Sequence, residues 1–282
     1  MRSDRQALAF GVEGQTKLEL LRVGVIGLGG LGSQIIQQLA HLGVRNYVLV
    51  DSDKVEAVNL NRIVGAYPGN VGTFKVRVAE RMIKKIAGNE LHDIKVFEKV
   101  LQVKEVLVAL GDCDILFGCL DSDGPRLILN ELAKACKIPY IDSAFEIFVE
   151  NDEIIEAGGR IVIVHPDGPC LLCCKEVNLR EAHHDLSSNE ERVYAEKRGY
   201  IDGINIKNPS MISLDGIIAS LAVTEFLATV TGFRDPHQYL LYDMIEGTVS
   251  PIGQSEQSNC FHILFEKTSI DELFRYCNQN AR

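Results

Sequence analysis

Apolar and polar positions between Val23 and Asp53 fall in blocks that predict a strand, a glycine turn, a helix and a second strand. An apolar run at 23–26 leads into the turn, apolar positions at helical spacing follow over 35–40, and a second apolar run ends in Asp51. The glycines of the turn are Gly27, Gly29, Gly30 and Gly32. This order predicts a nucleotide-binding βαβ unit, because the turn lets phosphates approach the backbone and the free amides at the helix start bind them.

Alternation of strands and helices continues through residue 165 and predicts an α/β fold with a mostly parallel central sheet flanked by helices. A helix opens near Val71 and presents an apolar face over 76–86. Further strands are predicted at 114–120, 138–141 and 160–164, with a helix at 127–136. An apolar helix is predicted from residue 210, late strands at 239–242 and 261–265, and a terminal helix at 269–277.

The pattern breaks after residue 165, where a CxxC precedes a long polar stretch. Such a span in a compact domain is typical of a lid or binding loop, or of a mobile segment, and we interpret His183 and His184 as exposed residues of that loop. The predicted organisation is a helical lead-in at 1–20, a nucleotide-binding core at 21–165, the CxxC and its loop at 166–208, and a last segment at 209–282 that completes the same domain.

The net charge, the cysteine content and the polarity of the first residues limit the classes of protein to which this chain can belong. The net charge of −10 argues against a protein that mainly tracks nucleic acid or an anionic membrane. The polar first residues predict no signal peptide, and eight cysteines in that context indicate a reducing compartment, where close pairs bind metal more often than they form disulfides. Asp215 and Glu225 interrupt the apolar segment at 210–230, which therefore predicts a buried core helix rather than a membrane span. We expect a cytoplasmic protein.

The polar segment at 52–67 leaves the carboxyl end of a predicted strand beside the glycine turn, where ligands bind in open α/β sheets. Its Asn59 and Arg62 can therefore face a triphosphate. Lys75 stands in the first turn of the next helix, where a lysine opposes the helix dipole. A nearby anion would explain that lysine, and a solvated side chain is the alternative. Asp51 is placed to bind the two ribose hydroxyls.

A candidate magnesium ligand follows the strand predicted at 114–120. This strand ends in Asp121-Ser122-Asp123, at the same sheet edge as the glycine turn. Magnesium binds one or two carboxylates together with phosphate oxygens, so Asp121 is a natural ligand. The alternative is that the acids cap the helix that follows.

A candidate zinc site combines distant parts of the chain. Cys170 and Cys173 form the CxxC, which needs two further ligands to close a tetrahedral zinc site. Cys260 and His262 can supply them. We therefore expect a structural Cys₃His site that ties the base of the loop to the late strands. The alternative is that these cysteines are reduced and packed.

These motifs together resemble the ThiF/MoeB/HesA family, the bacterial relatives of the ubiquitin-activating enzymes, from about residue 5 to 249. The landmarks are Arg5-Gln6, Gly14-Gln15-x-Lys17-Leu18, the glycine turn at 27–33, Asp51-x-Asp53, Asn59-Leu60-Asn61-Arg62, Lys75, Asp121 and Pro169-Cys170-x-x-Cys173. The resemblance implies a Rossmann-like domain that binds ATP and magnesium rather than NAD. It also implies adenylation of a carboxylate, usually the carboxyl terminus of a ubiquitin-like protein or peptide, with release of pyrophosphate.

The resemblance also assigns roles. Arg62, Lys75 and magnesium on Asp121 would offset the charge of the triphosphate, since a carboxylate must approach a ligand of its own sign. The glycines, Asp51, Asp53 and Asn59 would bind the nucleotide. Arg5 would reach the nucleotide of a partner subunit, which implies a homodimer. The loop at 175–208 would cross over the substrate tail.

The sequence departs from the family pattern at two places. The family's second CxxC is here only Cys260 with His262, and the loop after Cys174 contains no cysteine. We therefore expect activation to stop at the adenylate or to pass to an external nucleophile, without a covalent intermediate on this chain.

The alternative functions are a tRNA-modifying member of the same fold, an NAD-dependent oxidoreductase, and a scaffold that binds without turnover. The acidic charge disfavours nucleic acid as a partner.

Overall fold

The computed structural model describes residues 4–187, 209–253, 260 and 269–277, and it centres on an eight-stranded sheet. The strands lie in the order β3-β2-β1-β4-β5-β6-β7-β8. Their bounds are β1 Arg22–Ile26, β2 Asn46–Val50, β3 Asp93–Phe97, β4 Ile115–Gly118, β5 Tyr140–Glu150, β6 Glu153–Val164, β7 Tyr239–Asp243 and β8 Thr248–Pro251. Pairing is parallel from β3 to β5 and antiparallel from β5 to β8. The predicted fold class is confirmed.

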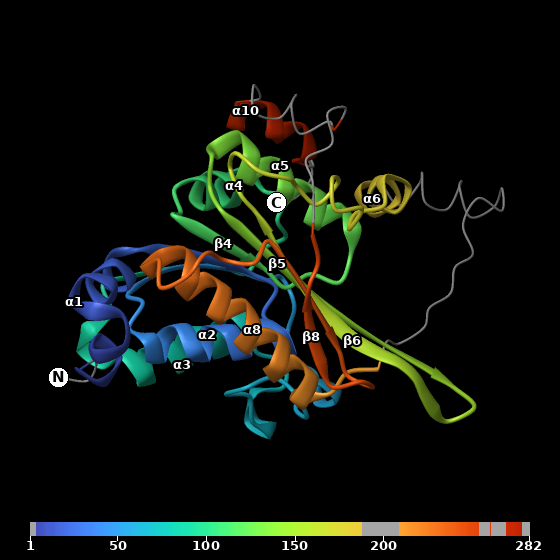
Figure 1. Cartoon of the computed structure of the whole chain (residues 1–282), viewed down its shortest axis with the longest axis horizontal. Helices are drawn as coiled ribbons and strands as arrows, with labels where there is room; N and C mark the ends of the chain where they lie inside the picture. Colours follow the sequence, from blue (N-terminus) through green and yellow to red (C-terminus); the bar gives the residue numbers. More distant parts are fainter. Residues whose placement is uncertain (1–3, 188–208, 254–259, 261–268, 278–282) are drawn as a thin grey trace.

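Helices cover both faces of the sheet (Figure 1). The helices are α1 Asp4–Leu20, α2 Gly30–Leu42, α3 Lys75–Ala87, α4 Lys104–Gly111, α5 Asp123–Cys136, α6 Leu179–Leu186, α8 Ile212–Thr231 and α10 Ile270–Leu273. One face carries α1, α2, α3 and α8, and the other carries α4, α5, α6 and α10. Because both faces are covered, β1 and β2 are buried from their second residue onward and read as continuous apolar runs.

The antiparallel half is built on a long hairpin of β5 and β6, which projects beyond the rest of the sheet (Figure 1). Asn151 and Asp152 form its turn with φ of 50° and 65°, the left-handed pair that matches the twist of paired strands. The short apolar runs predicted at 138–141 and 160–164 therefore mark only the buried ends of two longer strands. Exposed positions of the hairpin carry no apolar periodicity, so the sequence pattern missed them.

Several other expectations need correction. The segment at 175–208 begins with α6, so His183 and His184 lie on the last turn of a helix rather than in a loop, and His184 is half-buried. Amphipathic spacing of Leu179, Ala182 and Leu186 was the available signal. The strand predicted at 261–265 lies outside the described residues. The strands β3 and β8 and the helix α4 had no counterpart in the predicted elements.

The apolar helix predicted from residue 210 is α8, which is long and apolar enough to cross a membrane by length and composition alone. Half of its most apolar window is buried in the protein, where it packs against α2, β5 and α1. Asp215 and Glu225 are both buried within it. These contacts identify α8 as part of the core that supports the sheet.

The segment after β8, for which the sequence suggested no role, returns to the α4–α5 face. Glu131 of α5 is buried and accepts a hydrogen bond from the Tyr276 hydroxyl at 2.8 Å, and it forms an ion pair with Arg275 at 2.5 Å. The Lys104 ammonium lies 4.1 Å from the centre of the Phe274 ring. This segment therefore covers the helices that follow β3 and β4.

Candidate active site

The glycine turn lies at the carboxyl edge of the sheet, between β1 and α2. The Gly27 amide donates to the carbonyl of Val50 at 3.0 Å, which joins the turn to the end of β2. Gly27 has φ of +85°, and a Cβ at Gly32 would stand 1.9 Å from the Gly27 carbonyl oxygen, so both positions require glycine. A Cβ at Gly29 would meet nothing within 4 Å. The outer side of the turn is thus open to a ligand, beside the positive end of α2.

Asp51 binds the turn directly. Its Oδ2 accepts a hydrogen bond from the Leu28 amide at 2.6 Å, and its Oδ1 accepts one from the Asp53 amide at 2.7 Å. Burial raises the pKa of Asp51, although the Lys75 charge and these two amides act in the opposite direction. Because a carboxylate has about four acceptor positions, each oxygen keeps one for a ligand hydroxyl.

Lys75 begins α3 and is held beside Asp51 by Asp53. Its ammonium lies 2.8 Å from Oδ2 of Asp53, and its amide donates to the Asp53 carbonyl at 2.9 Å. The Lys75 side chain is 14% exposed, so its stem is packed while its charge remains at the surface. The lysine therefore has an anionic partner here, the Asp53 carboxylate, rather than a purely solvated ammonium.

The segment at 52–67 is fastened to α2. The Ser33 hydroxyl donates to the Gly30 carbonyl at 2.8 Å and accepts from the Val64 amide at 2.9 Å. Asn59 ends a short 3₁₀ helix, where its Oδ1 accepts from the Glu56 amide at 3.1 Å. These bonds hold the polar segment beside the glycine turn.

Arg62 is half-buried in the same segment. One guanidinium nitrogen donates to the Val58 carbonyl at 2.9 Å and to Oδ1 of Asn61 at 3.1 Å. Burial raises the pKa of Asp215 on α8 to about 6, and the Arg62 charge opposes this shift, which indicates that the guanidinium lies near the start of that helix. Arg62 thus lies between the polar segment and the two helix starts at this edge.

Asp121 and Asp123 follow β4 but differ in their contacts. Asp121 is exposed at the carboxyl edge. Asp123 accepts a hydrogen bond from Arg126 at 2.8 Å and another from the Asn178 amide at 2.8 Å. Asp123 therefore joins the start of α5 to the segment before α6, which leaves Asp121 as the acid available to a cation. Asp185 of α6 also binds this helix start through the Gly124 amide at 2.9 Å.

A buried ionic network supports this edge from below, and its centre is Asp142 of β5, which is 1% exposed. Arg126 binds both of its oxygens, at 3.2 and 2.7 Å, Arg160 binds Oδ2 at 2.8 Å, and the Tyr140 hydroxyl donates to Oδ1 at 2.7 Å. Burial raises the pKa of Asp142, but these partners outweigh it and hold the pKa below its ordinary value. Arg160 also pairs with Glu176 beyond the CxxC.

Arg5 does not lie at the site of its own chain. It is exposed near the start of α1, and its neighbour Gln6 donates to the carbonyl of His41, at the end of α2 opposite to the glycine turn. A helix of the length of α2 spans about 20 Å at about 1.5 Å per residue. Any contact of Arg5 with nucleotide would therefore be to another chain.

Three of the predicted zinc ligands lie together. The sulfur of Cys170 is 3.9 Å from that of Cys173 and 3.6 Å from that of Cys260, and all three residues are buried. Four thiolates at about 2.3 Å from a tetrahedral zinc would be about 3.8 Å apart, so the three sulfurs fit such an ion. His262, the predicted fourth ligand, lies outside the described residues. Cys174 is also buried beside this cluster.

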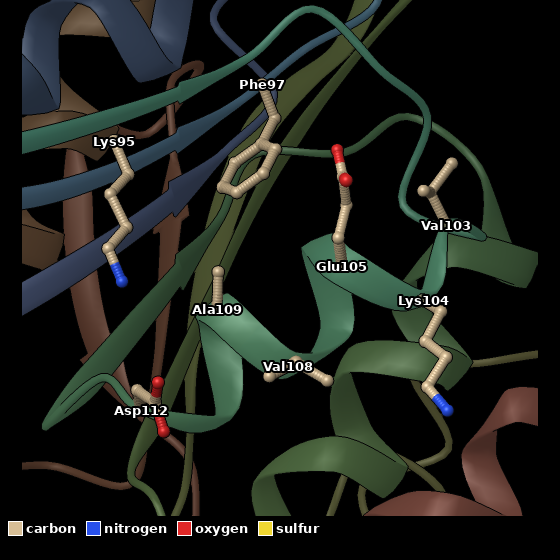
Figure 2. A pocket seen from close by; sticks show the side chains of 8 residues that line it. All are labelled: Lys95, Phe97, Val103, Lys104, Glu105, Val108, Ala109 and Asp112. Atoms are coloured by element: carbon tan, nitrogen blue, oxygen red, sulfur yellow. The ribbon is translucent and has the colours of Figure 1, made fainter. Parts of the chain in front are cut away.

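A surface groove lies away from these residues. Lys95 and Phe97 of the edge strand β3 form one side of it, and Lys104, Val108 and Asp112 from α4 and its end form the other (Figure 2). The groove contains none of the residues that the sequence analysis assigned to nucleotide, magnesium or zinc.

Two features of the site were missed by sequence reasoning. Asp215 is an acid in the first turn of an otherwise apolar helix, and that contrast was the available signal. Asp142 directly follows the apolar run at 138–141, where a carboxylate at a strand end is a candidate ligand or ion-pair partner. Its pairing with Arg126 and Arg160 needs the fold, because the three residues lie on α5, β5 and β6.

Comparison with known proteins finds relatives of this chain along most of its length. The model of the ThiF family matches residues 3–275. The chain is 29% identical to the molybdopterin-synthase adenylyltransferase of Escherichia coli, over 86% of this chain and 88% of that protein. It is 32% identical to the SAMP-activating enzyme E1 of Haloferax volcanii, over 58% of this chain and 56% of that protein. The match thus spans little more than half the length of the Haloferax relative.

Solved structures show the same fold. Escherichia coli MccB in a crystal with ATP matches 92% of this chain and 73% of its own, with a TM-score of 0.71 and 19% sequence identity. At this identity the likeness concerns the fold alone.

Proposed function

The chain belongs to the ThiF family, and on this premise we propose that it is an ATP- and magnesium-dependent adenylyltransferase acting on the carboxyl terminus of a ubiquitin-like protein or peptide. One observation carries the proposal: an open glycine turn, the Asp51 carboxylate that accepts from it, two cationic side chains and an exposed acid lie at one sheet edge. The relatives named as adenylyltransferases support the same reaction.

The proposed reaction is attack of the substrate carboxylate on the α-phosphorus of ATP, with pyrophosphate as the leaving group. The reacting groups carry the same sign, so positioning and charge compensation supply most of the catalysis. Asp51 would bind the ribose hydroxyls, and the amides that begin α2 would bind phosphate. Arg62 and Lys75 would offset the charge that develops on the phosphates, with Lys75 exchanging Asp53 for the ligand.

Asp121 would hold magnesium, which supplies positive charge to the triphosphate when it is bound. An exposed carboxylate at this edge fits that cation. The position of Arg5 beyond the far end of α2 supports a homodimer in which each chain completes the site of the other. Residues 188–208 of the predicted crossover segment lie outside the described residues, and their passage over the substrate tail is part of the proposal.

The direct test is exchange of labelled pyrophosphate into ATP, with purified protein, magnesium and candidate carboxyl-terminal peptides. We expect exchange that requires peptide and that disappears in Asp121→Ala. Exchange supported by tRNA and not by peptides would identify the nucleic-acid alternative. ATP binding without exchange for any substrate would contradict adenylation and favour a binding role, and binding of NAD in place of ATP would contradict the whole proposal.

We also propose that Cys170, Cys173 and Cys260 hold a structural zinc ion. The purified chain is expected to contain about one zinc by elemental analysis, and Cys170→Ser is expected to lose it and to unfold at a lower temperature, because structural zinc contributes to folding. Cys277→Ser, outside the cluster, is the matched control and should retain the metal. Zinc-free protein, or equal zinc content in both variants, would show that the cysteines are simply reduced and packed.

A further inference from the structure

Asp215 is a buried acid placed against the turn that we assign to phosphate. It lies in the first turn of α8 and is 1% exposed. Its Oδ2 has no hydrogen-bond partner in the described part of the chain. A Cβ at Gly30 would stand only 2.2 Å from this oxygen, so the carboxyl group rests directly on the first residue of α2.

Among the described residues, one positive charge, that of Arg62, acts on Asp215. Burial raises its pKa to about 6, while Arg62 and a hydrogen bond from Ser210 act in the opposite direction. Cys119 faces it from the end of β4, and burial together with Asp142 and Asp215 keeps the pKa of this thiol high, so it stays neutral. The first two turns of α2 contain no ionisable side chain. Arg62 is therefore the charge that stabilises the Asp215 carboxylate in the described part of the chain.

Nucleotide binding would disturb this balance. A triphosphate at the start of α2 brings several negative charges to a buried carboxylate, and like charges disfavour ionisation strongly where water is excluded. The same phosphates would attract the Arg62 guanidinium. The Asp215 carboxylate would then lose the nearby positive charge of Arg62 and at the same time be repelled by the negative charges of the phosphates. A proton on Oδ2 removes the repulsion and turns the unpartnered oxygen into a donor.

We propose that Asp215 is a positioning residue of the phosphate site, whose charge attracts the Arg62 guanidinium in the empty site and which takes up one proton when nucleotide binds. The inference rests on the proposed function, because it requires nucleotide at the glycine turn. Binding would release Arg62 to the phosphates and transfer one proton from solvent to the carboxylate, with no other bond made or broken. The affinity for ATP would therefore fall as pH rises above about 6, by up to about tenfold per pH unit.

Calorimetric titration with ATP and excess magnesium at pH 8, in two buffers of different ionisation enthalpy, counts the protons taken up. Wild-type protein is expected to take up close to one proton per nucleotide. Asp215→Asn, which keeps the size and an acceptor oxygen, is expected to take up almost none and to bind ATP about tenfold or more tightly at pH 8. The two proteins should bind with similar affinity near pH 5.5. Asp112→Asn, in the groove of Figure 2, is the matched control and should behave as wild type.

Equal proton uptake and equal pH dependence in wild type and Asp215→Asn would overturn the inference while leaving ATP binding intact. Wild-type protein that binds no ATP under any of these conditions would instead overturn the proposed function. If Asp215→Asn does not fold, the wild-type titration still decides, because binding without proton uptake contradicts the proposal.

Discussion

Arg62→Gln is expected to reduce peptide-dependent pyrophosphate exchange by about 10²–10³-fold, with a much smaller effect on ATP binding. Arg62 is half-buried, is held by Val58 and Asn61, and faces the helix starts at the carboxyl edge. Its charge is therefore already oriented before the transition state, in which negative charge on the phosphates is redistributed. Arg62→Lys should recover only part of the rate, since an ammonium cannot reproduce the planar, forked set of donors.

The measurement combines initial exchange rates with ATP affinities, so that loss of chemistry is separated from loss of binding. Arg81→Gln, which removes an exposed charge further along α3, is the matched control and should exchange at the wild-type rate. An exchange rate within threefold of wild type for Arg62→Gln would remove Arg62 from the proposed mechanism and leave Lys75 as the cation at this edge.

Asp142→Ala is expected to lower the free energy of unfolding by about 3–5 kcal/mol, because it leaves Arg126 and Arg160 buried without their shared carboxylate. Asp142 lies beneath the start of α5, so the same change is expected to loosen the loop that carries Asp121. Urea denaturation at pH 7 measures the loss. Asp112→Asn, an exposed acid at the end of α4, should change the stability by less than about 0.5 kcal/mol.

The pH dependence gives this prediction a second readout. The pKa of Asp142 is below its ordinary value of 3.8 in the folded protein, so its contribution is present above that value and is lost as pH falls through the lowered pKa. The stability difference between wild type and Asp142→Ala should therefore be constant from pH 5 to 7 and shrink in stronger acid. A difference of less than 1 kcal/mol at pH 7 would show that water or other groups satisfy the two arginines.

The sequence pattern was sufficient to predict those parts of the site whose residues lie close together in the chain. The glycine turn and Asp51 were predicted because a strand, a tight turn and a helix lie within one short segment. The position of Lys75 at a helix start left a nearby anion and a solvated side chain as alternatives, and the structure shows an ion pair with Asp53. The hairpin of β5 and β6 was only partly predicted, because its solvent-exposed part has no buried face to impose an alternation on the sequence.

By itself, the sequence determined the fold class and the family, and it predicted the edge of the sheet at which we propose that the nucleotide binds. A buried helix or strand needs apolar residues at regular spacing, and a tight turn that phosphate can approach needs glycines. Both features can therefore be recognised in short stretches of sequence. Only the tertiary structure brought Asp215 onto Gly30, Asp142 between two arginines, and Cys260 beside the CxxC. These pairings join residues far apart in the chain, so a short stretch of sequence does not predict them. Their contacts, and the effect of burial on their charges, exist only in the folded protein, where two layers of helices cover the sheet.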